Sequence, residues 1–149
     1  MNTFIPDLLI TDDLGKPVAA IEVKSWNNLS IDVATEMRRN MLDSGLPAQI
    51  PYFLLLSQDD GYLLKGSSNP NFDTPPMYHF PMQSVINRYS PVRSDRRLYE
   101  SELSLLVLHW LANLVAQYQE ITEEPEKTLA QAGFNDSIKH TIVLIEEGL

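Results

Sequence analysis

Three charged side chains interrupt two apolar runs near the start of the chain. The stretch PDLLITDDLGKPVAAIEVK, residues 6–24, places Asp7 ahead of the first run and Glu22 and Lys24 within the second. If the runs pair as a β-hairpin, Asp7 lies opposite Glu22 when paired residue numbers sum to 29, with Cβ atoms about 4.5–5.5 Å apart. Lys24, two residues beyond Glu22, shares that face. The pattern therefore predicts two carboxylates and one amine on one face of a hairpin.

This register depends on the connection between the runs. A loop of Leu14-Gly15, or of the four residues Asp13–Lys16, gives the sum of 29. A three-residue loop shifts the parity and separates the carboxylates unless a β-bulge restores it. The opposite face of the hairpin is apolar and is expected to be buried: Leu8, Ile10, Ile21 and Val23.

Two carboxylates held this close repel each other, and one has its pKa raised unless a positive charge is near. Lys24 is one candidate for that charge and a divalent cation is the other. Mg²⁺ is often bound by one or two carboxylates plus substrate phosphate, and a lysine beside it can hold a water or neutralise charge on a phosphate. The alternative interpretation is a cross-strand salt bridge on a half-exposed sheet, which contributes little to stability.

Pro6-Asp7, followed after a short hairpin by Glu22-Val23-Lys24, resembles the PD-(D/E)xK motif of the restriction-endonuclease-like nucleases. The run PDLLITDDLGKPVAAIEVKSW, the next helix and YFLLLSQDDGYLLKG are similar to the N-terminal nuclease domain of type I restriction enzyme motor subunits. The resemblance covers roughly residues 4–66.

The resemblance implies hydrolysis of phosphodiester bonds in DNA, dependent on Mg²⁺ or Mn²⁺, in a restriction or repair system. It implies that Asp7, Glu22 and the backbone carbonyl of Val23 ligate the metal, and that Lys24 positions the attacking water. Arg38 and Arg39, on the following helix, are candidates for contacts with nucleic-acid backbone phosphates. The alternative for this pair is a solvated helix face.

The remaining pattern predicts an α/β domain with a small mixed β-sheet, flanking helices and a helical C-terminal part. Residues 1–66 form the nuclease-like core, 67–99 an irregular connection and 100–149 helices packed on the core, all in one domain. The expected strands are Phe4–Thr11, Pro17–Lys24, Tyr52–Gln58 (covered on both faces) and the YLLKG run that pairs back from it. The first expected helix begins at Ser30 or Asp32 and ends near Ser44. Further helices are expected over Met82–Tyr89, over Ser101–Gln119 and from Asn135 or Asp136 to Glu147, with Glu120–Glu126 as an acidic linker.

The core that the chain resembles begins with a helix and a strand ahead of the aspartate. Only Met1–Ile5 precede Pro6 here. Either the C-terminal helices or a partner complete the core, or the chain is a truncated relic. The alternative function is therefore a catalytically inactive nuclease-fold module for interaction or oligomerisation, with a homodimer formed through the apolar helix Leu103–Tyr118.

Composition limits the remaining possibilities. The chain has 149 residues, 44% of them hydrophobic, and no cysteine, which excludes disulfides and thiolate metal sites and favours a cytoplasmic protein. Residues 1–99 carry 9 Lys and Arg against 11 Asp and Glu (net −2), and residues 100–149 carry 2 against 9 (net −7), giving −9 in total. DNA would thus meet the first part and be repelled by the second. The apolar run Leu103–Tyr118 is shorter than the roughly 20 residues of a membrane span, so no membrane association is expected.

Overall fold

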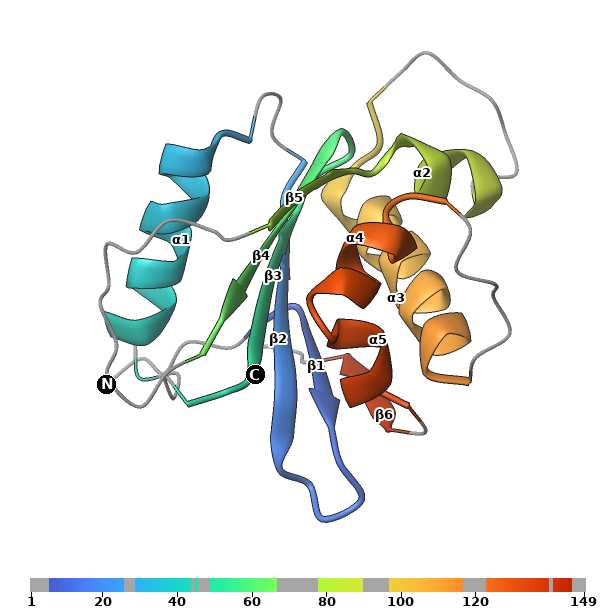
Figure 1. Cartoon of the computed structure of the whole chain (residues 1–149). Helices are drawn as coiled ribbons and strands as arrows, with labels where there is room; N and C mark the ends of the chain where they lie inside the picture. Colours follow the sequence, from blue (N-terminus) through green and yellow to red (C-terminus); the bar gives the residue numbers. More distant parts are fainter. Residues whose placement is uncertain are drawn as a thin grey trace.

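The computed structural model of the chain describes residues 6–25, 29–43, 45, 49–66, 78–89, 97–116, 123–139 and 141–145. Within these ranges a six-stranded sheet is covered by α1 on one face and by α2 to α5 on the other (Figure 1). The strands are β1 (Leu8–Thr11), β2 (Pro17–Val23), β3 (Tyr52–Leu56), β4 (Asp60–Lys65), β5 (Tyr78–Pro81) and β6 (Ile142–Ile145). The helices are α1 (Ile31–Asp43), α2 (Gln83–Tyr89), α3 (Glu100–Ala116), α4 (Glu126–Gln131) and α5 (Phe134–Ser137).

The sheet is mixed, as the sequence predicted, with strand order β5-β4-β3-β2-β1-β6. Only the β2–β3 pair is parallel among the strands described, and α1 is the crossover that connects the two. β3 lies near the middle of the sheet with helices over both faces, and all five of its residues are buried. The continuous apolar run of this strand follows from that position, which confirms the prediction for YFLLL.

The β1–β2 hairpin has the predicted register, reached through a bulge. Leu8 pairs with Ile21 and Ile10 with Ala19, each pair summing to 29, but Thr11 pairs with Pro17. The carboxylate of Asp12 organises the loop by accepting hydrogen bonds from the amides of residues 14 and 16, at 3.0 and 2.8 Å. The residue at 15 is a glycine because the turn needs a φ of +80° there. An odd-length loop and a bulge together leave the carboxylates in the predicted register.

The helix α1 begins where the sequence predicted, because the Ser30 hydroxyl accepts a hydrogen bond from the Val33 amide at 3.2 Å. The predicted end at Ser44 lies outside the described residues. Its apolar stripe packs on one face of the sheet. This core layer consists of Ala20, Leu29, Ala34, Met37, Met41, Leu42, Ile50, Phe53, Leu55, Tyr62 and Leu64.

The helix α3 supplies much of the second core layer, on the opposite face of the sheet. Its buried residues are Leu103, Leu106, Val107, Trp110, Leu111, Leu114 and Val115. These side chains therefore pack within the core of the chain itself. On α3, Leu105 is the large apolar residue that is exposed, with 61% exposure. The last two residues of the predicted dimer helix, Gln117 and Tyr118, lie outside the described residues, and dimerisation stays a prediction. No helix of the described part is long and apolar enough to cross a membrane.

Two predictions for the second half of the chain are wrong. The predicted final helix from Asn135 or Asp136 to Glu147 is replaced by the four-residue α5 and by the strand β6, while residues 146–149 lie outside the described part. β6 pairs antiparallel with β1 along its whole length. The predicted irregular connection 67–99 contains the predicted helix α2 and an unexpected strand, β5, on the other edge of the sheet.

Candidate functional site

The three predicted site residues lie together at one end of the sheet. Asp7 immediately precedes β1, Glu22 is the penultimate residue of β2 and Lys24 directly follows that strand. Alternation along β2 places Glu22 and Lys24 on the α1 side, because Ile21 and Val23 face the other core layer. β2 is parallel to β3, and the carboxyl ends of parallel strands are where open α/β sheets bind their ligands.

Asp7 is held in place by the backbone of β2. Its Oδ2 accepts a hydrogen bond from the Val23 amide at 2.8 Å, across the hairpin. The Asp7 carboxyl group also lies close enough to the Glu22 side chain to raise its pKa. The structure thus brings together the two carboxylates that the register placed opposite each other.

Glu22 is 7% exposed, and its surroundings disfavour the ionised form. Burial, the hydrogen bond with Asp7 and the repulsion of the Asp7 charge together raise the pKa of Glu22 from 4.5 to about 8, while Lys24 opposes the shift. The raised pKa favours the protonated form of the Glu22 carboxyl group at neutral pH.

Lys24 is half-buried and close enough for its charge to act on Glu22. Its backbone is fixed by a hydrogen bond from its amide to the Leu56 carbonyl at 2.9 Å. A surface ion pair would lower the pKa of the carboxylate, whereas the pKa of Glu22 is raised. Glu22 is thus buried rather than half-exposed, and the effect of Lys24 on its pKa is smaller than the combined effects of burial and Asp7.

The donor set fits a hard cation of the Mg²⁺ kind, which needs as few as one or two carboxylates when waters and substrate phosphate complete its shell. Across the described ranges no group of three or more His, Asp or Glu side chains is arranged to hold a metal ion. Asp7 and Glu22 stay the predicted side-chain ligands. The Val23 carbonyl stays a prediction as a ligand; its peptide contributes the amide that holds Asp7.

The two arginines predicted to contact phosphates occupy different places on α1. Arg38 is 5% exposed, and its guanidinium lies 5.9 Å from the centre of the Phe53 ring in the core layer. Burial lowers the pKa of this guanidinium. Arg39 is exposed on the outer face of the helix. Of the two, only Arg39 is positioned on the surface of α1.

Sequence reasoning missed a contact from the start of α3. The Ser25 amide donates a hydrogen bond to Glu100 Oε1 at 3.3 Å, so α3 begins beside the residue that follows Lys24. The two residues are 75 positions apart, and no local pattern could have indicated that they meet.

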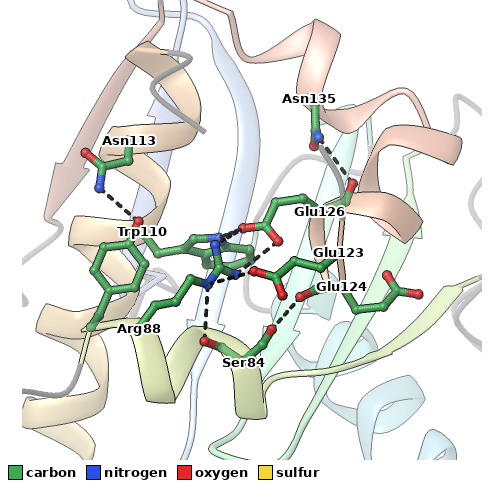
Figure 2. A network of polar contacts seen from close by, with 9 residues as sticks. Ser84, Arg88, Trp110, Asn113, Glu123, Glu124, Glu126 and Asn135 are labelled. Carbon is green, nitrogen blue, oxygen red and sulfur yellow. Dashed lines mark hydrogen bonds and ion pairs between the residues drawn. The ribbon is translucent and has the colours of Figure 1, made fainter. Parts of the chain in front are cut away.

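A second buried glutamate lies in the helical layer and has different partners. Glu126, 1% exposed, binds the Arg88 guanidinium through both carboxylate oxygens at 2.8 and 3.0 Å. The Trp110 indole N–H donates to Glu126 Oε2 at 2.8 Å, and the Asn135 side-chain amide donates to the Glu126 carbonyl at 3.2 Å. Figure 2 shows the side chains of Arg88 (α2), Trp110 (α3) and Asn135 (α5) converging on Glu126 of α4. The cluster connects the helices of this layer to one another. Glu126, the last residue of the predicted acidic linker, is therefore buried.

Comparison with family models, with curated proteins and with solved structures finds no match for this chain.

Proposed function

We propose that this chain is a Mg²⁺-dependent nuclease that hydrolyses phosphodiester bonds in DNA at a site formed by Asp7, Glu22 and Lys24. The observation that carries the proposal is the proximity of the half-buried Asp7 carboxyl group to the buried Glu22 carboxyl group, beside Lys24. A buried carboxyl group that faces another carboxyl group weakens the folded state, and such perturbed groups concentrate at functional sites. The resemblance to the PD-(D/E)xK nucleases supports the same assignment.

Each residue has a role that follows from its chemistry. The carboxylates of Asp7 and Glu22 would hold the cation, which replaces the proton that they otherwise share. When bound, the cation supplies Lewis-acid polarisation of the scissile phosphate and lowers the pKa of bound water. Lys24 would orient the attacking water and offset negative charge that develops on the phosphate. The Val23 amide keeps Asp7 aimed at this point.

The arrangement of the C-terminal elements supports the proposal further. The core that the chain resembles has a helix and a strand ahead of the aspartate. In this chain β6 pairs with β1 on the side away from β2, and α3 packs on both β6 and β2. A strand and a helix from the end of the chain thus lie beside the hairpin that carries Asp7 and Glu22.

The test is DNA cleavage by purified variants with matched controls. Lys24→Ala and Asp7→Asn are expected to lower the rate of Mg²⁺-dependent cleavage at least about a hundredfold, because each removes a group that acts on the transition state. Lys16→Ala and Asp13→Asn change the same residue types at exposed positions of the hairpin loop and should cleave like the wild type. Circular dichroism and thermal denaturation establish that all four variants fold.

Cleavage by the Lys24→Ala protein at the wild-type rate would refute the role of Lys24. Wild-type protein that cleaves neither single-stranded nor duplex DNA with Mg²⁺ or Mn²⁺ would refute the proposed function itself.

A further inference from the structure

Three consecutive backbone amides at the end of β2, those of residues 23–25, each donate a hydrogen bond to a different segment of the chain. The first two donate to the Asp7 carboxylate and to the Leu56 carbonyl, at 2.8 and 2.9 Å. The third donates to Glu100 Oε1 at 3.3 Å. The backbone on either side of Lys24 is thus held by the residue before β1, by the end of β3 and by the first residue of α3.

Glu100 is itself held in place by the residues ahead of α3. Arg97 forms an ion pair with Asp59 at 2.7 Å, and the Leu98 amide donates to Gln58 Oε1 at 2.8 Å. Both acceptors belong to the turn that follows β3, and α3 itself packs on β2. The first residue of α3 therefore has a fixed position relative to the ends of β2 and β3.

Glu100 can act on the candidate site through the backbone. The side chains of Glu22 and Lys24 lie on the α1 side of the sheet, and α3 covers the opposite face (Figure 1). The hydrogen bond to Glu100 meets the chain at residue 25, one residue beyond Lys24. A misplacement of a reacting group by about 1 Å can lower a rate about a hundredfold. A carboxylate that fixes the peptide after Lys24 therefore restricts the positions that the Lys24 amine adopts.

We propose that Glu100 is a positioning residue: by holding the amide of Ser25, it keeps the amine of Lys24 aligned with the scissile phosphodiester. This inference rests on the proposed function. The hydrogen bond lies at the surface of the protein, where a single contact adds little to the free energy of unfolding. Its loss should therefore change the rate of cleavage more than the stability, which distinguishes a positioning role from a structural one.

The first experiment compares steady-state cleavage of DNA with Mg²⁺ by the wild type and three variants. Glu100→Ala removes the acceptor and should lower kcat about tenfold with KM unchanged, because substrate still binds while Lys24 is aligned less often. Glu100→Gln keeps an acceptor oxygen at the same side-chain length and should retain the wild-type kcat. Ser101→Ala, at the next exposed position of α3, is the matched control and should cleave like the wild type. Thermal denaturation midpoints should agree among the four proteins.

The second experiment measures hydrogen exchange of the amides of residues 23–25 by NMR, without substrate or metal. In Glu100→Ala the Ser25 amide should exchange about tenfold faster than in the wild type, because it has lost its hydrogen-bond acceptor. Glu100→Gln should retain the protection. The Val23 amide, whose acceptor is Asp7, should exchange equally in all three proteins and is the internal control.

The outcomes separate failure of this inference from failure of the proposed function. If the wild type cleaves DNA and Glu100→Ala has the same kcat, or the same exchange rate at Ser25, the positioning role alone is overturned. A loss of kcat that Glu100→Gln does not restore, together with a lower denaturation midpoint, would also overturn it, because the loss would then come from the stability of the fold. Absence of cleavage in the wild type would overturn the proposed function and this inference with it.

Discussion

Glu22 and Glu126 are both buried, at 7% and 1% exposure, in the layers on the two faces of the sheet, Glu22 on the α1 side of β2 and Glu126 at the start of α4. Glu126 meets a guanidinium in a two-oxygen ion pair and an indole N–H. Glu22 meets another carboxyl group, and its pKa is raised to about 8. The same side chain is thus buried with an opposite charge in one layer and with a like charge in the other.

The difference separates a structural group from a functional one. A buried charge that has its partner is part of the fold, and its loss weakens the fold. A buried carboxyl group that faces a like charge lowers stability, and proteins retain such arrangements mainly where they bind or react. Glu126 connects helices, whereas we propose that Glu22 exchanges its proton for a cation. The following changes test this distinction.

The largest effect on stability is expected at Glu126. Glu126→Gln leaves the Arg88 guanidinium facing a neutral amide, and breaking a buried pair from one side lowers the free energy of unfolding by about 3 kcal/mol or more. Replacing both partners, as Arg88→Met with Glu126→Leu, should recover most of that loss. Urea denaturation monitored through Trp110 measures both. A loss below about 1 kcal/mol would show that the cluster behaves as a surface ion pair.

Substitution of Glu22 is expected to have a smaller effect on stability than substitution of Glu126, and of the opposite sign. Between pH 4.5 and about 8 the folded chain retains a proton on Glu22 that the unfolded chain releases. The folded state binds more protons in this window, so the contribution of Glu22 to stability is full below pH 4.5 and is lost as the pH rises to about 8. Glu22→Gln cannot ionise and should be more stable than the wild type above pH 8.

Denaturation midpoints measured across this pH range check the prediction. Glu36→Gln, at an exposed position on α1, should follow the wild-type profile. Identical profiles for Glu22→Gln and the wild type would mean that the carboxyl of Glu22 ionises equally in the folded and unfolded chain.

Local patterns were sufficient to predict the hairpin and the placement of Asp7, Glu22 and Lys24. Alternation and a turn fix a hairpin register within about 20 residues, and Ser30 marks the start of α1. By contrast, β6 takes its conformation from pairing with β1, more than 130 residues earlier, and short apolar segments do not distinguish helix from strand by themselves. Glu126 was predicted to belong to an acidic linker, because its partner, Arg88, is 38 residues away and local sequence does not indicate that contact. The unpredicted features are those that depend on contacts between distant segments.

The smallest effect expected is stabilisation by Mg²⁺. A ligand that binds only the folded state at about ten times its dissociation constant adds about 1.4 kcal/mol to the free energy of unfolding. Glu22→Gln and Asp7→Asn should lose this increment because they remove the acidic ligands, whereas Asp13→Asn should keep it. Glu126→Gln should keep it as well, despite its lower stability, because Glu126 belongs to the structural cluster.

The same titration reports on the proton that the cation displaces. Below pH 8 Glu22 must release its proton for Mg²⁺ to bind, so the affinity should rise with pH up to about that value. Calorimetry at pH 7 in buffers of different ionisation enthalpy should detect proton release by the wild type and none by Glu22→Gln. If Mg²⁺ stabilised the wild type and Glu22→Gln equally, the buried pair would not be the metal site, and the contrast between the two glutamates would be one of stability alone.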